Sequence, residues 1–227
     1  MRKPSLPLWF WAAALFVFLY APIAVVIVYS FNSARHGGPW QGFTTDWYGK
    51  LFDSQEKIDA AKNTLILGLS STGIATVLGT LLGYGLSRYR FPGKKLFSRL
   101  MYIPVVIPDI VMAIAMLMFF SLVRDHLGLF ELGMTTMIVA HVTLPMILPA
   151  VVAGAMLAFT LSLDDFVVSF FTTGPGAGTL PILIYSSVKR GITPDINALS
   201  TLIVLVSVIG TLAGLIFERP RRTSGES

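Results

Sequence analysis

Residues 134–173 read MTTMIVAHVTLPMILPAVVAGAMLAFTLSLDDFVVSFFTT, forty residues in which Asp164 and Asp165 are the only acidic or basic side chains apart from a histidine. An ionised carboxylate at the centre of a membrane helix costs about 2.5–3.5 kcal/mol even on the lenient insertion scale. Acidic residues at that depth therefore usually mark a substrate pathway, a partner or a proton relay. The alternative is that both aspartates lie near a helix end and are hydrated there.

The composition around this stretch is that of an integral membrane protein. The chain has 227 residues, of which 54% are hydrophobic and only 13% charged, and its mean hydropathy is +0.73. Soluble domains carry about 25% charged residues. The absence of cysteine excludes a disulfide framework and a thiolate metal site. The net charge of +5 does not indicate nucleic-acid binding, because the basic residues are distributed among the loops as membrane topology requires.

Four other apolar stretches approach or exceed the length of about 20 residues that a membrane span needs. These predicted spans are Leu8–Phe31, Asn63–Ser87, Met101–Val123 and Ile196–Phe217. The first has no small-residue cleavage site and is expected to be retained. In the second, Gly79 and Gly83 form a pair of small residues that is typical of closely packed helices. Pro104 and Pro108 predict a kink in the third.

The basic residues predict the orientation. The N-terminus, the segment 88–99 and the tail together hold ten basic and two acidic residues, whereas the intervening loops hold seven of each. Both termini and the 88–99 segment are therefore expected in the cytoplasm, and the polar loop 32–62 outside. This orientation requires two crossings within 134–173. Forty residues span only about 60 Å as helix, barely two crossings of a 30 Å core. Residues 150–173 are long enough to cross alone but 134–144 are not, so the fourth span is predicted to be truncated.

No catalytic motif accompanies these spans. The chain lacks a GxxxxGK[ST] phosphate loop, an HExxH zinc motif and a GxSxG nucleophile elbow. No catalytic residue, metal site or cofactor is predicted, and His141 is expected to form a helix–helix hydrogen bond. An intramembrane aspartyl protease would need Asp109 and Asp165 on facing helices. That alternative is disfavoured because no Gly-x-Gly precedes either residue, and because Asp164 and Asp165 would point about 100° apart on one helix.

Several motifs resemble one family. Residues 157–176, LAFTLSLDDFVVSFFTTGPG, and 179–201, TLPILIYSSVKRGITPDINALST, resemble the permease subunits of bacterial spermidine/putrescine ABC importers. RYRFPGK at 88–94 and IPVVIPDI at 103–110 are also similar to that family, as are YAPI and VYSFN near the N-terminus. The resemblance covers nearly the whole chain.

The resemblance implies an all-α polytopic bundle of the type-I ABC importer permease fold, in which spans four and five are truncated or fused. Residues 1–62 would hold the N-terminal transmembrane helix and a periplasmic loop. Residues 63–217 would form the transmembrane domain, shortened near 143–145, and residues 218–227 a basic cytoplasmic tail. The chain would lie in the bacterial inner membrane as a transporter subunit and not as an enzyme.

The resemblance also implies partners and a site. The partners would be a second permease, two cytoplasmic ATP-binding subunits that hydrolyse ATP, and a periplasmic polyamine-binding protein. Asp109, Asp164 and Asp165 are the candidates to line the route of a polycation, because intramembrane carboxylates offset its desolvation. Phe166 and Tyr102 are candidates for cation–π contacts, although aromatic residues in spans more often pack or face lipid.

One departure from the family concerns the loop that couples a permease to its ATPase. Members carry an E-A-A-x-x-x-G segment that runs into L-P-x-x-x-P-A, and Leu144, Pro145 and Pro149 match only that ending. They directly follow residues 138–143, which resemble the opening of span four, and no Glu-Ala-Ala occurs in the chain. Coupling to an ATPase is therefore expected to be poor or absent. A permease for another small organic solute, or a non-transporting assembly subunit, remains as an alternative.

Overall fold

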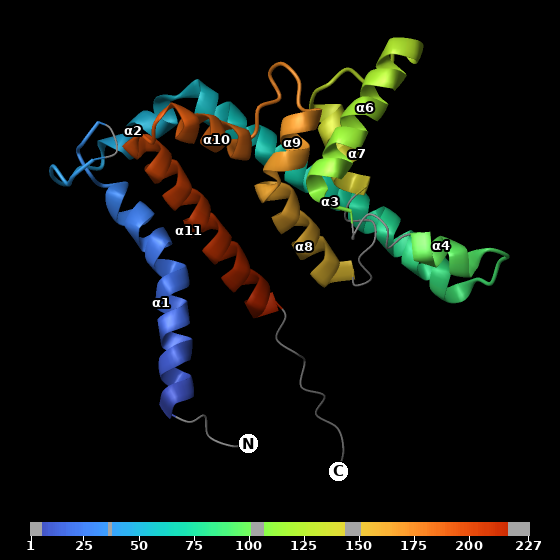
Figure 1. Cartoon of the computed structure of the whole chain (residues 1–227), viewed down its shortest axis with the longest axis horizontal. Coiled ribbons are helices and arrows are strands. Elements are labelled where there is room, and N and C mark those ends of the chain that lie inside the picture. Colours follow the sequence, from blue (N-terminus) through green and yellow to red (C-terminus); the bar gives the residue numbers. More distant parts are fainter. Residues whose placement is uncertain (1–5, 36–37, 101–106, 144–150, 218–227) are drawn as a thin grey trace. The chain divides into compact units, whose positions relative to one another are not determined.

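The computed structural model describes residues 6–35, 38–100, 107–143 and 151–217, and the side chains of 9–35, 38–100, 107–143 and 158–209. The described residues form α-helices joined by loops (Figure 1), and they contain no β-strand beyond an isolated bridge between Asn32 and Phe43. The chain divides into two compact units. One comprises Met1–Ser54 with Ser187–Ser227, and the other comprises Gln55–Ser186.

The first unit holds three helices, α1 (Leu6–Tyr29), α2 (Asp46–Asp53) and α11 (Pro194–Phe217). The helix α11 packs against both α1 and α2. The indole nitrogen of Trp47 donates a hydrogen bond to the carbonyl oxygen of Asn32 (2.7 Å), and the hydroxyl of Tyr48 lies 2.8 Å from that of Ser30. These bonds fix α2 to the end of α1. The segment 32–62, which the sequence predicts as a loop, thus contains a helix.

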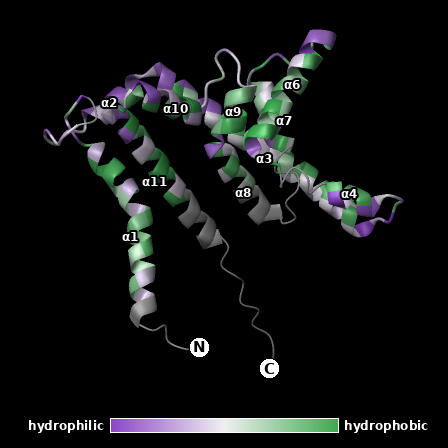
Figure 2. Cartoon of the chain, viewed as in Figure 1, coloured by the Kyte–Doolittle hydropathy of each residue, from purple (hydrophilic) through white to green (hydrophobic). Residues whose placement is uncertain are grey.

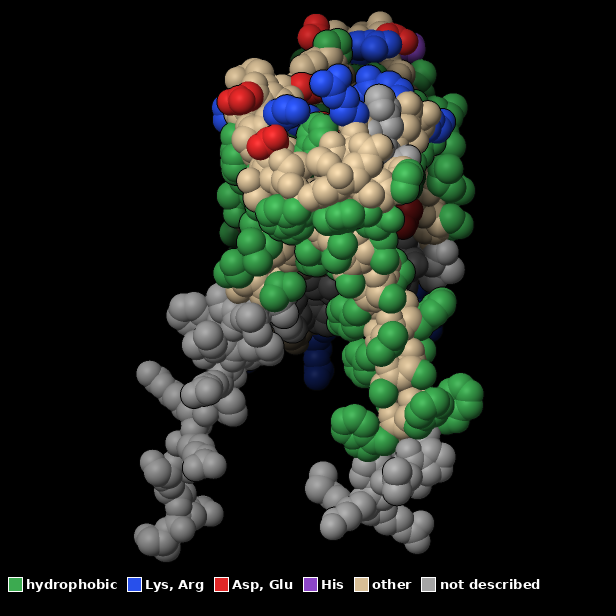
Figure 3. All heavy atoms as spheres, turned by 90° about the vertical axis from the view of Figure 1, so that its left-hand side faces the viewer, with side chains coloured by type: hydrophobic (Ala, Val, Ile, Leu, Met, Phe, Trp, Pro, Cys, Tyr) green, Lys and Arg blue, Asp and Glu red, His purple; other side chains and the backbone are tan. Residues whose placement is uncertain are grey.

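The helix α1 is apolar around its whole circumference. Figure 2 shows hydrophobic residues along most of its length. On the face drawn in Figure 3, hydrophobic side chains cover much of the lower surface, while most of the visible lysine, arginine and acidic side chains lie near the top. Trp9 and Phe18 are 67% and 77% exposed. A helix that exposes large apolar side chains on every side is stable only in lipid or against another protein, which agrees with a membrane span.

Three helical segments of the described chain are long and apolar enough to cross a membrane, namely Trp9–Tyr29, Gln55–Arg88 and Asp109–Leu127. They coincide with the first three predicted spans, and α11 covers the fourth. The third begins later than predicted, at Asp109 instead of Met101. Pro108 has an extended backbone (φ −56°, ψ 137°) and precedes the helix. The predicted kink at Pro108 is therefore wrong, while Pro104 lies outside the described residues.

The second unit is built around the longest helix, α3, and contains most of the charged residues considered below. Its helices are α3 (Gln55–Arg88), α4 (Lys94–Leu100), α6 (Asp109–Leu127), α7 (Met134–Thr143), α8 (Val151–Asp164), α9 (Phe166–Thr172) and the start of α10 (Leu180–Arg190). The helix α3 packs against α7 and α8, and α9 packs against α6 and α7 (Figure 1). The charged ends of α6, α8 and α9 belong to this unit.

Close contact between α3 and α8 depends on a glycine that the sequence pattern does not single out. A Cβ atom added to Gly68 would lie 3.2 Å from side-chain atoms of Phe159 and Leu163. One turn further along α3, the hydroxyl of Ser71 lies 3.0 Å from that of Ser162. A Cβ atom at Gly83 would meet nothing within 4 Å. The predicted close approach at Gly83 is therefore not found within the described part of the chain.

Within the described residues, the stretch 134–173 contains α7 (Met134–Thr143), α8 (Val151–Asp164) and α9 (Phe166–Thr172). Residues 144–150, between α7 and α8, lie outside the described residues, so the truncation of the fourth span stays a prediction. Residues 150–173, which the sequence predicts as able to span alone, are broken between α8 and α9. Leu144, Pro145 and Pro149 lie outside the described residues.

Candidate functional site

The three aspartates of the predicted pathway lie at the ends of three helices. Asp109 is the first residue of α6, Asp164 is the last residue of α8, and Asp165 is the N-cap of α9. Asp164 and Asp165 are consecutive, and α6, which begins with Asp109, packs against α9, which Asp165 caps. The structure therefore brings together three residues that are up to 56 positions apart in the sequence. We call Asp109, Asp164 and Asp165 the aspartate cluster.

Asp165 begins a new helix instead of continuing the preceding one. Its Oδ1 accepts a hydrogen bond from the backbone nitrogen of Val168 (2.9 Å), and its backbone is extended (φ −69°, ψ 94°). An aspartate at an N-cap satisfies one of the amide groups that have no partner within the helix. The prediction that Asp164 and Asp165 point about 100° apart on one helix is therefore wrong, because α8 ends at Asp164.

The helix ends give the carboxylates different environments. Asp109 lies at the positive N-terminal end of α6, and Asp165 caps the N-terminus of α9, where negative charge is favourable. Asp164 lies at the C-terminus of α8, where the helix dipole disfavours a carboxylate. Asp109 and Asp164 are exposed, whereas the Asp165 side chain is 19% exposed. Asp164 therefore gains most from a cation placed against the cluster.

His141, on α7, is a buried residue next to Asp165. Its side chain is only 2% exposed, and its Nε2 lies 3.8 Å from Oδ2 of Asp165 and 3.4 Å from the hydroxyl of Ser169. Its Nδ1 lies 2.8 Å from the carbonyl oxygen of Met137, which can only accept a hydrogen bond. The proton on Nδ1 therefore points to Met137, and Nε2 is directed to Asp165 and Ser169. This contact joins α7 to α9.

Phe166 lies beside the cluster within a group of aromatic rings. Its ring centroid is 4.4 Å from that of Tyr185 and 5.3 Å from that of Phe170. Tyr185 is 40% exposed and Phe170 is 48% exposed. The rings of this group are therefore packed against one another and still accessible at their outer faces, as a cation–π contact needs. Tyr102, the other predicted aromatic candidate, lies outside the described residues.

Polar and backbone contacts hold α9 and the loop after it in place. The hydroxyl of Thr136 donates to the carbonyl oxygen of Thr172 (2.9 Å), and both residues are fully buried. A Cβ atom at Gly174 would collide with the carbonyl group of Leu132. The loop therefore packs backbone against backbone at this point, and only glycine fits there.

Within the described residues, no group of three or more His, Cys, Asp or Glu side chains is close enough to hold a metal ion. The three carboxylates of the aspartate cluster therefore do not form a shared metal site; they lie separately, at the ends of α6, α8 and α9.

Comparison with known proteins places this geometry in a family. The chain is 37% identical to the spermidine/putrescine transport system permease protein PotC of Escherichia coli K12, over 92% of this chain and 92% of that protein. It is 35% identical to PotC of Haemophilus influenzae, over 85% and 89% of the two chains. The chain belongs to the family of spermidine/putrescine transport system permease proteins. The permease is also 34% identical to the putrescine transport system permease protein PotI of Escherichia coli K12, over 91% and 89%. No protein-family model matches it.

Membership of this family confirms several expectations from the sequence. The permease is an all-helical, multi-pass protein of the inner membrane and a transport subunit, not an enzyme. The alignment with Escherichia coli PotC extends over 243 positions, whereas 92% of the 227 residues is about 209, so about 34 positions of PotC have no counterpart here. The permease is therefore shorter within its matched region than this relative.

Sequence reasoning did not find three contributors to the site. His141, Ser169 and Tyr185 are 24, 4 and 20 residues from Asp165 along the chain. The sequence predicts that His141 forms a helix–helix hydrogen bond. It does not predict the partner, because the partner depends on how α7 packs against α9. The break at Asp165, whose carboxylate caps the amide of Val168, is seen only in the structure.

Proposed function

We propose that this permease forms part of the pathway of an ATP-driven uptake system for spermidine and putrescine, and that the aspartate cluster contacts the solute in transit. The observation that carries the proposal is the convergence of Asp109, Asp164 and Asp165 at the ends of α6, α8 and α9. The names of the relatives support the solute class, since both PotC and PotI are named for putrescine.

The chemistry of the cluster supports a polyamine over a neutral solute. A polyamine carries positive charges separated by methylene chains, and it loses hydration when it enters the membrane. Separate carboxylates replace part of that hydration without binding the solute so tightly that it cannot leave. The ring group of Phe166, Phe170 and Tyr185 offers aromatic faces next to Asp165, for both the methylene chain and the ammonium groups.

The proposed assembly contains a second permease, two cytoplasmic ATP-binding subunits that hydrolyse ATP, and a periplasmic polyamine-binding protein. The proposed orientation places both termini and the basic segment 88–99 in the cytoplasm, as the distribution of lysine and arginine favours. In this orientation α6 begins with Asp109 on the cytoplasmic side and ends at Leu127 outside. The proposed domain boundaries, 1–62, 63–217 and 218–227, follow from the same topology.

We also propose that the segment joining spans four and five is shortened, and that coupling to ATP hydrolysis is impaired. The apolar stretch 134–144, which is too short to cross the membrane, the absence of Glu-Ala-Ala and the roughly 34 unmatched positions of PotC support this. The test inserts the missing segment from Escherichia coli PotC after Thr143 and measures polyamine-stimulated ATP hydrolysis in the assembled complex. We expect stimulation to appear only with the insertion. Equal stimulation in both chains would refute impaired coupling.

The pathway itself is tested by uptake of radiolabelled putrescine in that loop-restored chain, so that weak coupling does not hide the result. Asp164→Asn with Asp165→Asn removes both charges while asparagine keeps the N-cap of α9. We expect uptake to fall at least tenfold. The matched control is Asp125→Asn, at the exposed end of α6. Uptake unchanged by the double substitution would instead favour a subunit that only assembles with its partners.

A further inference from the structure

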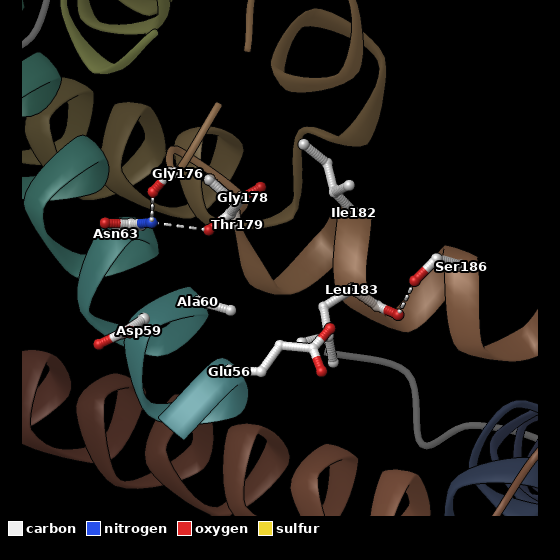
Figure 4. Close-up of a pocket in the computed structure, with 10 residues that line it drawn as sticks. All are labelled: Glu56, Asp59, Ala60, Asn63, Gly176, Gly178, Thr179, Ile182, Leu183 and Ser186. Atoms are coloured by element: carbon white, nitrogen blue, oxygen red, sulfur yellow. Dashed lines mark hydrogen bonds between the residues drawn. The ribbon is translucent and has the colours of Figure 1, made fainter. Parts of the chain in front are cut away.

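A pocket of about 300 Å³ lies within the second unit, away from the residues of the aspartate cluster. It is formed by the first two turns of α3, the glycine-rich loop 173–179 and the first turns of α10 (Figure 4). Its volume is at the lower end of the range found for small-molecule sites, about 300–1,000 Å³. We call it the α3–α10 pocket. It is large enough for one end of a small linear molecule.

Hydrogen bonds from α3 hold the far wall of the pocket in place. The side-chain amide of Asn63 donates to the carbonyl oxygens of Gly176 (3.1 Å) and Gly178 (2.9 Å), as Figure 4 shows. One residue along, the hydroxyl of Thr64 accepts a hydrogen bond from the backbone nitrogen of Leu180 (2.8 Å). The loop and the start of α10 are therefore fixed to α3 before any ligand binds.

One polar group in this wall has no hydrogen-bond partner. Thr179 lines the pocket and is 1% exposed, and its Oγ1 has no partner among the described residues. A buried hydroxyl without a partner is destabilising by about 1–3 kcal/mol, and such groups in native proteins call for an explanation. The hydroxyl itself is buried within the wall and not exposed to the pocket.

The rest of the pocket lining is acidic on the α3 side and apolar on the α10 side. Glu56, in the first turn of α3, contributes a carboxylate that forms no ion pair among the described residues, and Figure 4 shows it directed to the side of Leu183. Asp59, the other acidic residue of the lining, lies 3.8 Å from Nζ of Lys62 and is already paired. Ile182 and Leu183 make the wall on the α10 side apolar. The combination fits an ammonium group attached to an aliphatic chain.

We propose that the α3–α10 pocket binds the terminal ammonium and adjoining methylene groups of an aliphatic amine, with Glu56 as the counter-ion and Ile182 and Leu183 as the apolar wall. The proposal rests on the proposed function for the identity of the solute. In the proposed orientation, the N-terminus of α3 and the loop 173–179 face outside. The pocket is then a first binding position for a polyamine before it reaches the aspartate cluster.

The test measures equilibrium binding of radiolabelled putrescine to the full chain in nanodiscs of phosphatidylcholine, a lipid without net charge. The chain carries Asp164→Asn and Asp165→Asn, so that the aspartate cluster contributes little to binding. In this background we expect Glu56→Gln to raise Kd about tenfold, the effect of losing one charge-assisted contact. Glu131→Gln is the matched control, because Glu131 is exposed and lies outside the pocket.

The melting temperature of the Glu56→Gln chain is measured beside that of the parent, so that a loss of folding is not mistaken for a loss of binding. A Kd within twofold of the parent in the Glu56→Gln chain would overturn the proposal. The pathway fails separately: if the aspartate substitutions leave uptake unchanged while Glu56→Gln still weakens binding, the α3–α10 pocket stands and the aspartate route does not.

Discussion

The imidazole Nε2 of His141 lies 3.8 Å from the carboxylate of Asp165, and this contact links α7 to the N-terminus of α9. The histidine is almost fully buried, while the aspartate retains contact with solvent. Asp165 in turn follows Asp164 in the chain and caps α9, which packs against the helix that begins with Asp109. The buried side chain of His141 therefore supports the position of Asp165, one of the three carboxylates of the proposed pathway.

His141→Ala is expected to destabilise the permease by about 1–3 kcal/mol, because it opens a cavity and leaves Ser169 without its side-chain neighbour. Thermal unfolding in detergent measures the change as a lower melting temperature. His126→Ala is the control, since His126 makes the same kind of contact to the carbonyl oxygen four residues earlier (3.0 Å) but is exposed on α6. Equal melting temperatures for the two variants would contradict a supporting role for His141.

Asp165→Ala and Asp165→Asn are expected to separate the cap from the charge. Alanine removes the hydrogen bond to Val168 and should lower stability by about 1 kcal/mol, within the range of 0.5–2 measured for N-caps. Asparagine keeps that bond and should leave stability nearly unchanged. Both should reduce putrescine uptake in the loop-restored chain, because both remove the charge. Normal uptake with asparagine would show that only the cap matters.

Gly68→Val is expected to weaken the packing of α3 against α8. The new side chain would meet Phe159 and Leu163, which already lie 3.2 Å from the position of a Cβ atom. Overpacking of this kind typically destabilises by about 1–3 kcal/mol. Gly73→Val, on the same helix with nothing within 4 Å, should have little effect or a stabilising one. A melting temperature that falls equally in both would argue against the α3–α8 contact.

Gly174→Ala is expected to displace the loop that follows α9, because the added methyl group would collide with the carbonyl group of Leu132. Neither group is at the end of a flexible side chain, so the backbone must move. Limited proteolysis should then cut the loop 173–179 faster than in the parent chain. Gly133→Ala, where a Cβ atom meets nothing within 4 Å, is the comparison. Identical cleavage rates in the two variants would count against the tight backbone contact.

The spans were predictable because hydropathy over about 20 residues is a property of the sequence alone. The Leu8–Phe31 and Asn63–Ser87 stretches accordingly match α1 and most of α3. The break at Asp165 was not predicted. The residues around the Asp164–Asp165 pair are mostly apolar and suit a continuous helix, and the capping bond of Asp165 competes locally with helix continuation. The helix α2 was missed because its amphipathic eight residues are too short to stand out in a polar loop.

The aspartate cluster was predicted from unusual charge within an apolar run, although its geometry was not. The convergence of Asp109 with Asp165 depends on how α6 packs against α9, which no local pattern encodes. No pattern in the sequence predicts the α3–α10 pocket. Glu56 and Thr179 are 123 residues apart, and they line one pocket only because Asn63 and Thr64 bind the loop and α10.

The double hydrogen bond of Asn63 has a mechanical consequence. The side-chain amide of Asn63 donates hydrogen bonds to two carbonyl oxygens of the loop 173–179. The hydroxyl of Thr64 accepts one from the first residue of α10. Because α3 is one continuous helix of 34 residues, a tilt at its C-terminal end would also move its N-terminal end and the glycine-rich loop bonded to it. A movement that tilts α3 would therefore also narrow or widen the α3–α10 pocket.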